Sequence, residues 1–323
     1  MIVVAGEALV DLVTRADGSV LARLGGGPYN VARTIGRLGR PVSFLGMLST
    51  DRFGREFRQQ LADDGVDHHD SLLTEAPTTL AVAELDGSGS ASYRFYTEGT
   101  SAPALTAVPD GWRAPAAVQT GTLGLVLTPM ADTIMAYLAG LPDDTIVMLD
   151  PNCRPNIVPS RAAYLTTIDA AYRHADVVKV SVDDIEYLAP GSNPLDYAAT
   201  VLACGPRAVL VTGGGASSWA VTAQGAEELL PPPIEVVDTI GAGDSFAGSF
   251  LTWWLDHDLA AADLTQLAPV AQATVAAQEV AAFTCRQVGA QPHAARPVER
   301  RLARLTTTAR APLPPGNPAA LRW

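Results

Sequence analysis

The sequence is poor in lysine and cysteine. Among 323 residues the only lysine is Lys179, and the three cysteines are Cys153, Cys204 and Cys285. An odd number of cysteines without a CxxC pair argues against a disulfide framework and fits a reducing compartment. The chain also has no Gly-Lys-Ser/Thr sequence, so any phosphate chemistry here is not of the P-loop type.

The chain also lacks excess positive charge and long apolar runs. It carries 22 Lys plus Arg against 34 Asp plus Glu, a formal net charge of −12. A polyanion binder needs the opposite sign, so we expect no nucleic-acid partner, although a small phosphorylated ligand is not excluded. No apolar run reaches about 18 residues, which predicts no membrane span. The N-terminal run has no basic residues before it and soon meets Glu7 and Asp11, so we interpret it as a buried strand of a cytoplasmic protein rather than a signal peptide.

Short β-branched runs alternate with longer segments of helical periodicity. This order predicts right-handed βαβ units, and therefore a mostly parallel sheet covered by helices on both faces. The expected strands are 2–6, 42–46, 117–123, 145–150, 177–181 and 208–213, and the expected helices are 28–38, 54–64, 130–139, 160–174, 194–203, 243–256 and 264–283.

Two regions interrupt that alternation. Residues 8–24 predict a strand pair around Asp17-Gly18, and residues 78–97 alternate apolar and polar side chains around a Gly/Ser turn. We expect these hairpins, from about 8–24 and 78–98, to form a small β lid over the crevice where α/β folds bind ligands. The lid is then an insertion in one α/β domain spanning 1–305, followed by an irregular Pro-rich tail at 306–323.

The stretch 238-DTIGAGDSFAGSF-250 is the strongest local signal of chemistry. A strand-like run at 234–238 leads into glycines, and Asp244 lies at the start of an amphipathic helix. Such a turn leaves backbone N–H groups free to bind an anion. A purely structural alternative is that Gly241 and Gly243 make the turn and Asp244 caps the helix. A Rossmann dinucleotide site fits poorly, because Phe246 stands where its third glycine is needed.

Two long motifs together resemble the ribokinase-like (PfkB) family of carbohydrate kinases. The stretch 238–250 is similar to the second signature of that family, and 25-GGGPYNVARTIGRLG-39 is similar to its first. The segment 206-PRAVLVTGGG-215 resembles its ATP-site strand and loop, and 6-GEALVDLV-13 and 150-DPNCRP-155 look most like the fructokinase branch. The resemblance implies a ribokinase-like three-layer α/β/α core with a small β lid.

The resemblance also implies the catalytic and sugar-binding residues. Asp244 matches the base that takes a proton from the sugar hydroxyl, and the N–H groups of Gly241, Ala242, Gly243 and Asp244 match an anion hole for the transferred phosphoryl group. The residues expected to contact the sugar are Asp11, Gly26, Gly27, Asn30, Arg154 and, on one face of the lid, Tyr93 and Phe95. With Lys179 inside an apolar run, Arg154 is the expected cation of the site, although a surface arginine is the alternative.

The nucleotide and metal sites are implied in the same way. Ser181, Thr212, Gly213, Gly214, Gly215 and Gln278 match positions around ATP, although helix packing alone explains Gln278. Asp184 matches a position that organises Mg²⁺ through water, but it departs from the glutamate usual there, and Asp183 or Glu186 could take over. The carbonyls of Asp238 and Ile240 match a monovalent-cation (K⁺) site of many relatives.

The resemblance therefore implies an ATP- and Mg²⁺-dependent sugar kinase that converts fructose to fructose 6-phosphate. The first signature lacks the lysine of ribokinases, and Thr97 stands where relatives acting on 2-keto-3-deoxygluconate carry an arginine. Other sugars and nucleosides stay open as substrates, and a catalytically silent binding module is a further alternative. The exposed edges of the lid favour a homodimer.

Overall fold

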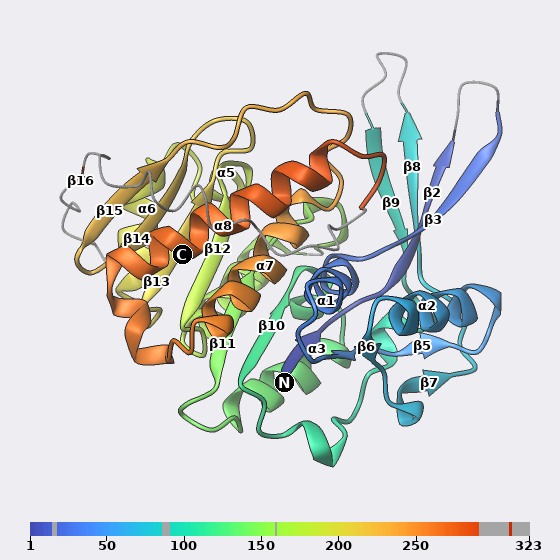
Figure 1. Cartoon of the computed structure of the whole chain (residues 1–323). Coiled ribbons are helices and arrows are strands. Elements are labelled where there is room, and N and C mark those ends of the chain that lie inside the picture. Colours follow the sequence, from blue (N-terminus) through green and yellow to red (C-terminus); the bar gives the residue numbers. More distant parts are fainter. Residues whose placement is uncertain (15–17, 86–90, 159, 291–309, 312–323) are drawn as a thin grey trace.

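The computed structural model describes residues 1–14, 18–85, 91–158, 160–290 and 310–311, and a ten-stranded sheet forms its centre. The strand order is β16-β15-β14-β13-β12-β11-β10-β1-β4-β6 (Figure 1). The seven strands β6, β4, β1, β10, β11, β12 and β13 are parallel to one another, and β14, β15 and β16 continue the sheet in antiparallel pairing. The bounds are β1 Ile2–Ala5, β4 Val42–Leu45, β6 Val66–Asp67, β10 Ala117–Gly121, β11 Ile146–Asp150, β12 Val177–Ser181, β13 Ala208–Thr212, β14 Ser218–Thr222, β15 Gly225–Leu229 and β16 Arg310–Ala311.

Helices cover both faces of this sheet. Helices α1, α2, α7 and α8 share one apolar core with the sheet, and α3, α4, α5 and α6 share a second core on the opposite face. Both faces are therefore shielded from water, which is why the central strands are continuous apolar runs rather than alternating ones. The bounds are α1 Gly27–Arg37, α2 Arg52–Asp63, α3 Met130–Ala139, α4 Arg161–Tyr172, α5 Val182–Leu188, α6 Pro194–Leu202, α7 Ala242–Asp256 and α8 Leu267–Cys285.

The expected lid is a separate four-stranded sheet with the order β3-β2-β8-β9. Strands β2 (Leu9–Thr14) and β3 (Val20–Gly25) form the first hairpin, and β8 (Leu80–Leu85) and β9 (Ala91–Tyr96) form the second. Strands β2 and β8 pair in parallel and so join the two hairpins into one sheet. This sheet projects from one side of the core (Figure 1). Residue Asp17 of the first turn and residues 86–90 of the second lie outside the described residues.

The predicted α/β fold is confirmed, and all seven expected helices are present with ends shifted by at most three residues, the largest shift being from 264 to Leu267. Three local predictions were incomplete or wrong. Helix α5 and the β14–β15 hairpin were missed, and 234–238 is not a strand. Three consecutive prolines, 231–233, precede that segment, and the N–H groups of Val237 and Asp238 bond to the carbonyl of Cys285 instead of to a strand.

The remaining elements are short. Strands β5 (Leu48–Ser49) and β7 (Leu73–Thr74) pair with each other. Most of the expected irregular tail lies outside the described residues, as does the expected boundary at 305, but Arg310–Ala311 form β16 beside β15. In the part of the chain that the structure describes, no helix is both long and apolar enough to cross a membrane.

Candidate active site

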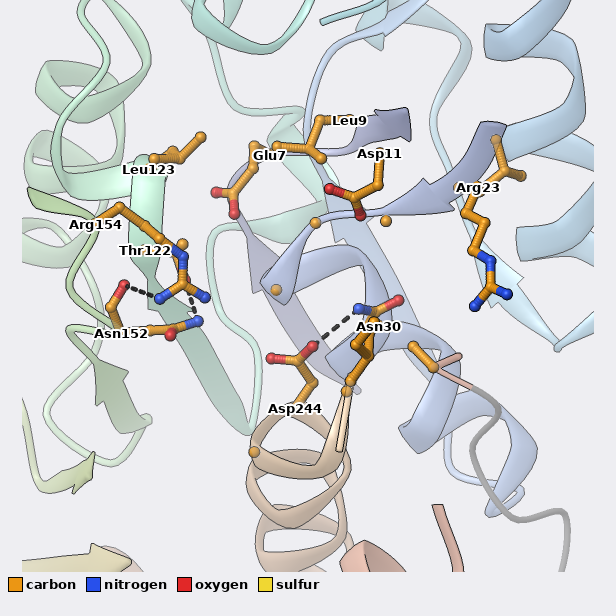
Figure 2. Close-up of a pocket in the computed structure, with 18 of the residues that line it drawn as sticks. Glu7, Leu9, Asp11, Arg23, Asn30, Thr122, Leu123, Asn152, Arg154 and Asp244 are labelled. Atoms are coloured by element: carbon orange, nitrogen blue, oxygen red, sulfur yellow. Dashed lines mark hydrogen bonds between the residues drawn. The ribbon is translucent and has the colours of Figure 1, made fainter. Parts of the chain in front are cut away.

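A cavity of about 460 Å³ lies between the lid and the carboxyl ends of the central strands. On the core side, the cavity is lined by the starts of α1 and α7 and by the segments that follow β1, β10 and β11, and on the lid side by β2, β3 and β9. Figure 2 shows Glu7, Arg154 and Asp244 among the side chains around it. Parallel strands bring their carboxyl ends to one edge, so residues far apart in sequence meet here. Of the predicted site residues, the cavity is lined by Asp11, Gly26, Gly27, Asn30, Tyr93, Phe95, Arg154, Ile240, Gly241, Gly243 and Asp244.

The glycine loop at the start of α7 has the geometry of an anion site. Gly241 is left-handed, with φ 79°, and a Cβ there would lie 2.5 Å from the Cβ of Ala290, so the position requires glycine. The Ala242 N–H donates to the carbonyl of Thr239 at 3.2 Å. Within the described residues, the N–H groups of Gly241, Gly243 and Asp244 make no backbone hydrogen bond. Three of the four expected donors therefore remain available for an anion.

Asp244 lies in the first turn of α7, and its carboxylate lies beside the side chain of Asn30 of α1 (Figure 2). The Asn30 Nδ2 donates to the Asp244 carboxylate at 2.9 Å. Burial raises the pKa of Asp244 to about 6, against the opposing effects of the Asn30 hydrogen bond and of the Lys179 and Arg154 charges. Removal from water thus outweighs the favourable helix terminus. A carboxyl group with this pKa is mostly ionised at neutral pH and is a stronger base than an exposed aspartate.

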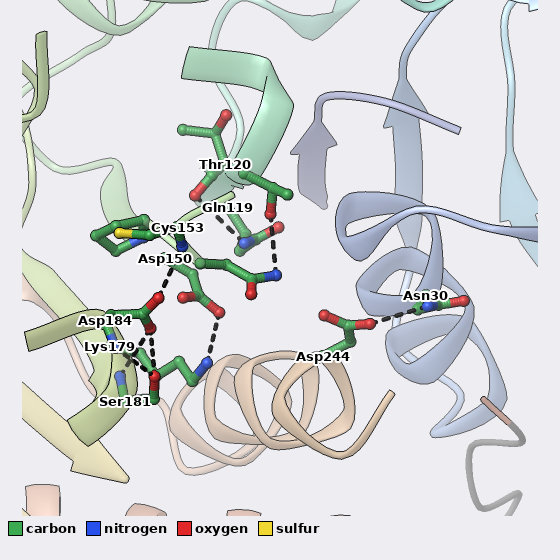
Figure 3. A network of polar contacts seen from close by, with 12 residues as sticks. Asn30, Gln119, Thr120, Asp150, Cys153, Lys179, Ser181, Asp184 and Asp244 are labelled. Atoms are coloured by element: carbon green, nitrogen blue, oxygen red, sulfur yellow. Dashed lines mark hydrogen bonds and ion pairs between the residues drawn. The ribbon is translucent and has the colours of Figure 1, made fainter. Parts of the chain in front are cut away.

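Lys179, which we expected to be unavailable, lies beneath the glycine loop. Its Nζ donates to Asp150 at 2.8 Å (Figure 3), and a Cβ at Gly243 would come within 3.0 Å of the same Nζ. Burial opposes its charge, but the carboxylates of Asp150 and Asp184 outweigh that effect and raise its pKa. The lysine is therefore charged and borders the cavity. The expectation that no lysine is available to the site was wrong, and Lys179 borders the cavity together with Arg154.

The part of the cavity wall formed by β2 and the start of α1 offers groups suited to binding the hydroxyl groups of a ligand. Burial raises the pKa of Asp11 to about 6 against the nearby charges of Arg154 and Arg23. Gly26 has φ 111°, and a Cβ there would lie 2.6 Å from the carbonyl oxygen of Glu7. The buried Asn30 Oδ1 has no hydrogen-bond partner among the described residues. This wall therefore presents a carboxyl group, an amide oxygen and closely packed glycines.

The lid contributes two aromatic rings from β9. Tyr93 and Phe95 line the cavity, with ring centroids 6.4 Å apart and planes 27° from parallel. The structure thus places the predicted lid face over the site. Arg154 reaches the cavity from the loop after β11, and its Nη1 donates to the carbonyl of Cys153 at 3.1 Å.

The predicted nucleotide residues lie outside this cavity. Ser181 and Thr212 are paired at the carboxyl ends of β12 and β13, and Gly213, Gly214 and Gly215 follow in the turn to β14. The buried Gln278 donates to the carbonyl of Leu229 at 3.0 Å, which ties α8 to β15. This contact fits the helix-packing alternative for Gln278.

Asp184 is already engaged within the protein. One of its oxygens accepts from the Cys153 N–H at 2.7 Å, and the other accepts from the Ser181 N–H at 3.0 Å and from its hydroxyl (Figure 3). Ser181 and Asp184 form the capping box of α5, a pattern that could have predicted the missed helix. Within the described residues no group of three or more His, Cys, Asp or Glu side chains could hold a metal ion.

The segment proposed for a monovalent cation is anchored at both ends. The Asp238 carboxylate accepts from the N–H groups of Ile240 at 3.0 Å and Gly289 at 2.8 Å. The carbonyls of Asp238 and Ile240 accept no backbone hydrogen bond among the described residues. Those two oxygens are therefore the right kind of free ligand for K⁺.

Several lining residues were missed in the sequence: Glu7, Arg23, Thr122, Asn152 and Lys179. Glu7 and Arg23 could have been found, because Glu7 follows a buried strand and Arg23 pairs with Asp11 across the lid hairpin. Thr122 and Asn152 have left-handed backbones, with φ 49° and 38°, and such strain often marks a functional site. The sequence around Thr122 and Asn152 does not predict a left-handed backbone.

Comparison with known proteins agrees with this geometry. A fructokinase from Rhizobium leguminosarum bv. trifolii is 30% identical over 257 residues, 78% of each chain. A fructokinase from Salmonella typhimurium is 31% identical over 272 residues, 82% of this chain and 88% of its own.

Solved structures show the same fold. The crystal structure of a Xylella fastidiosa fructokinase with bound ATP has a TM-score of 0.82 at 24% identity and covers 94% of this chain and 98% of its own. A Vibrio cholerae O395 fructokinase double mutant, bound to fructose, ADP and a potassium ion, has a TM-score of 0.77 at 25% identity, with coverage of 95% and 98%. The family model of the pfkB family carbohydrate kinases matches residues 1–296. The chain belongs to the pfkB family of carbohydrate kinases and is a sugar kinase.

Proposed function

We propose that this kinase transfers the γ-phosphoryl group of ATP to fructose and forms fructose 6-phosphate. The Asp244 carboxylate carries the proposal. It borders the cavity beside Asn30, and within the described residues it adjoins three N–H groups of its own helix terminus that make no backbone hydrogen bond. The relatives named fructokinase and the fructose- and ADP-bound neighbour support this substrate and nucleotide.

The proposed reaction is a direct in-line transfer. Asp244 accepts the proton of the attacking sugar hydroxyl, whose oxygen forms a bond to the γ-phosphorus. The bond from that phosphorus to the bridging oxygen of ADP breaks, and ADP leaves with the electron pair. The N–H groups of Gly241, Gly243 and Asp244 would hold the oxygens of the transferring group, and Lys179 and Arg154 supply positive charge near them. Asp11, Asn30 and the backbone at Gly26 and Gly27 would hold the sugar under Tyr93 and Phe95.

Metal ions belong to the same proposal. Mg²⁺, when bound with ATP, neutralises phosphate charge and reaches the protein mainly through water. Binding through water fits the described residues, in which no group of three or more His, Cys, Asp or Glu side chains could hold a metal ion. Asp184 remains the proposed contact through water, although both of its carboxylate oxygens already accept hydrogen bonds within the protein. The free carbonyls of Asp238 and Ile240 fit K⁺, and the potassium-bound neighbour supports this assignment. Ser181, Thr212, Gly213, Gly214 and Gly215 are proposed to flank the nucleotide, with Gln278 near its base.

We also propose a single domain over 1–305, a cytoplasmic location and a homodimer paired through the lid. Three free cysteines fit the reducing cytoplasm. Among the described strands, none pairs with the outer edges of β3 and β9 in the lid. These strands carry the exposed apolar side chains of Val20 and Tyr96, which pairing in a dimer would cover. Light scattering of the purified chain tests the dimer, and a monomer would contradict it.

The decisive experiment measures ADP release with Mg·ATP and a panel of sugars, sugar acids and nucleosides. We expect the highest kcat/KM with fructose. Asp244→Asn keeps the shape of the site but removes the base, so turnover should fall about 10²–10⁴-fold while ATP still binds. A higher kcat/KM with a sugar acid would contradict the substrate, and an Asp244→Asn enzyme with unchanged turnover would contradict the mechanism.

A further inference from the structure

Glu7 is a buried carboxyl group in the cavity wall that has no established role in the site. It follows β1, is 1% exposed and borders the cavity. Neither of its carboxyl oxygens has a hydrogen-bond partner among the described residues. Buried polar groups are nearly always hydrogen-bonded in folded proteins. Since the described protein groups do not supply that partner, a hydroxyl group of a ligand in the cavity can do so.

The backbone around Glu7 is tightly packed, which fixes where its side chain begins. A Cβ at Gly6 would lie 2.4 Å from Cγ of Pro28, and one at Gly26 would lie 2.6 Å from the Glu7 carbonyl oxygen. The backbone at Gly6 and Glu7 therefore packs directly against the start of α1. Figure 2 shows the carboxyl group in the same wall as Asp11, directed toward the space beside Arg154.

Glu7 differs from Asp11 in its protonation. Burial raises the pKa of Glu7 to about 8, and the charge of Asp244 adds to that rise. The backbone N–H groups of Glu7 and Gly27 lie near the carboxyl group without making a hydrogen bond of normal geometry, and they and the Arg154 charge act in the opposite direction but do not cancel the rise. Arg154 from the loop after β11 and Asp244 from α7 are the charged groups that act on Glu7. At neutral pH it is mostly a neutral acid, which can both donate and accept a hydrogen bond.

We propose that Glu7 is a further sugar-binding residue whose carboxyl group exchanges a hydrogen bond with one substrate hydroxyl. The proposal rests on the sugar site described under "Proposed function". Asp11, ionised at neutral pH, accepts hydrogen bonds from hydroxyl groups, whereas Glu7 can donate to a hydroxyl oxygen, so the two acids can contact different hydroxyl groups of the sugar. Arg154 is the other conceivable partner, but it donates to the Cys153 carbonyl and makes no hydrogen bond to Glu7.

The test compares Glu7→Leu and Glu7→Gln with the wild-type enzyme. Leucine removes the hydrogen bond, so KM for the sugar should rise about tenfold or more, while KM for ATP stays unchanged. Glutamine keeps a neutral donor and acceptor and should restore most of the sugar affinity. Because the Glu7 carboxyl group makes no hydrogen bond of normal geometry within the described residues, neither variant should lower the melting temperature of the ligand-free enzyme. Glu56→Gln, at an exposed carboxylate paired with Arg52, is the matched control and should change none of these values.

Two further readouts distinguish sugar contact from a structural role. In a series of monodeoxy sugars, the analogue that lacks the hydroxyl contacted by Glu7 should show equal KM with wild type and Glu7→Leu, and the others should not.

The second readout is the pH dependence of sugar binding. A raised pKa means that the neutral form of Glu7 is lost as pH rises, so the wild-type KM for the sugar should increase above pH about 8. The Glu7→Gln enzyme cannot ionise at this position and should lack that increase.

Failure of this inference is separable from failure of the proposed function. If wild type phosphorylates none of the sugars, the proposed function fails. If wild type is active but Glu7→Leu has an unchanged KM for sugar, Glu7 does not bind it. A lower melting temperature in both variants, with KM values for sugar and ATP rising together, would also overturn the inference and assign Glu7 to packing or to Arg154.

Discussion

At the scale of single residues, the surroundings of Asp244, the proposed base, set how strongly its carboxylate binds a proton. The carboxylate is removed from water by α1 and the loop after β11, yet Asn30 donates to it and Lys179 lies beneath its loop. The first effect raises its pKa and the others limit the rise to about 6. The proposed base is therefore matched to neutral pH, where a catalytic carboxylate has to be both ionised and able to take a proton.

The same pKa predicts how activity depends on pH. Because the pKa is raised, protonation begins to remove the base as pH falls through about 6. The pKa of Asp11 is raised to about 6 as well. We expect log kcat/KM for the sugar to fall below pH 6 with a limiting slope between one and two. In Asp11→Asn the slope should approach one, and a profile that stays flat down to pH 5 in wild type would contradict the role of Asp244.

At the scale of elements, the start of α7 depends on one left-handed glycine. Gly241→Ala would place a methyl group 2.5 Å from the Ala290 Cβ at a φ of 79°, so the loop has to move. Gly39, which follows α1, has φ 80° with nothing near its missing Cβ, and it is the matched control. Each alanine costs about 1–2 kcal/mol of left-handed strain. Only Gly241→Ala should also lower kcat, by tenfold or more, as measured by ADP release.

The capping box of α5 predicts a structural phenotype at the proposed metal residue. Asp184→Ala keeps Ser181 as the N-cap but loses the hydrogen bond from the Ser181 N–H, worth about 1 kcal/mol. It also leaves the buried Cys153 N–H unpaired, which costs about 1–3 kcal/mol more. Urea unfolding should reveal this loss, whereas alanine at the exposed Asp183 should change stability little. If Asp184 also acts through water on Mg²⁺, its variant needs a higher Mg²⁺ concentration for half-maximal activity. An Asp184→Ala enzyme of unchanged stability would contradict the structural part.

The sequence predicted those elements whose signals are local. Glycine turns, apolar periodicity and strand alternation identified the glycine loop, the seven helices and both lid hairpins. It failed where partners are distant along the chain. Lys179 looked like a core residue, because its pairing with Asp150 exists only once β11 and β12 lie side by side. The β-branched run at 234–238 looked like a strand, but its N–H groups are taken by Cys285 at the end of α8.

At the scale of the whole molecule, the cavity lies between two bodies of the fold. Asp11, Tyr93 and Phe95 come from the lid, whereas Asn30 and Asp244 come from helices of the core. A ligand held by all five links the lid to the core, and a ligand that binds only the folded state stabilises it by RT ln(1 + [L]/Kd).

This linkage predicts how ligands change thermal stability. At a fructose concentration about 100 times its Kd, the folded state should gain about 2.7 kcal/mol, visible as a rise in melting temperature by calorimetry. Asp244→Asn should keep most of that rise, because Asp11 and the lid rings remain, although its turnover is lost. Asp11→Asn should lose much of it. A sugar that is turned over without any stabilisation, or an Asp11→Asn enzyme with the full rise, would show that the lid carboxylate does not hold the substrate.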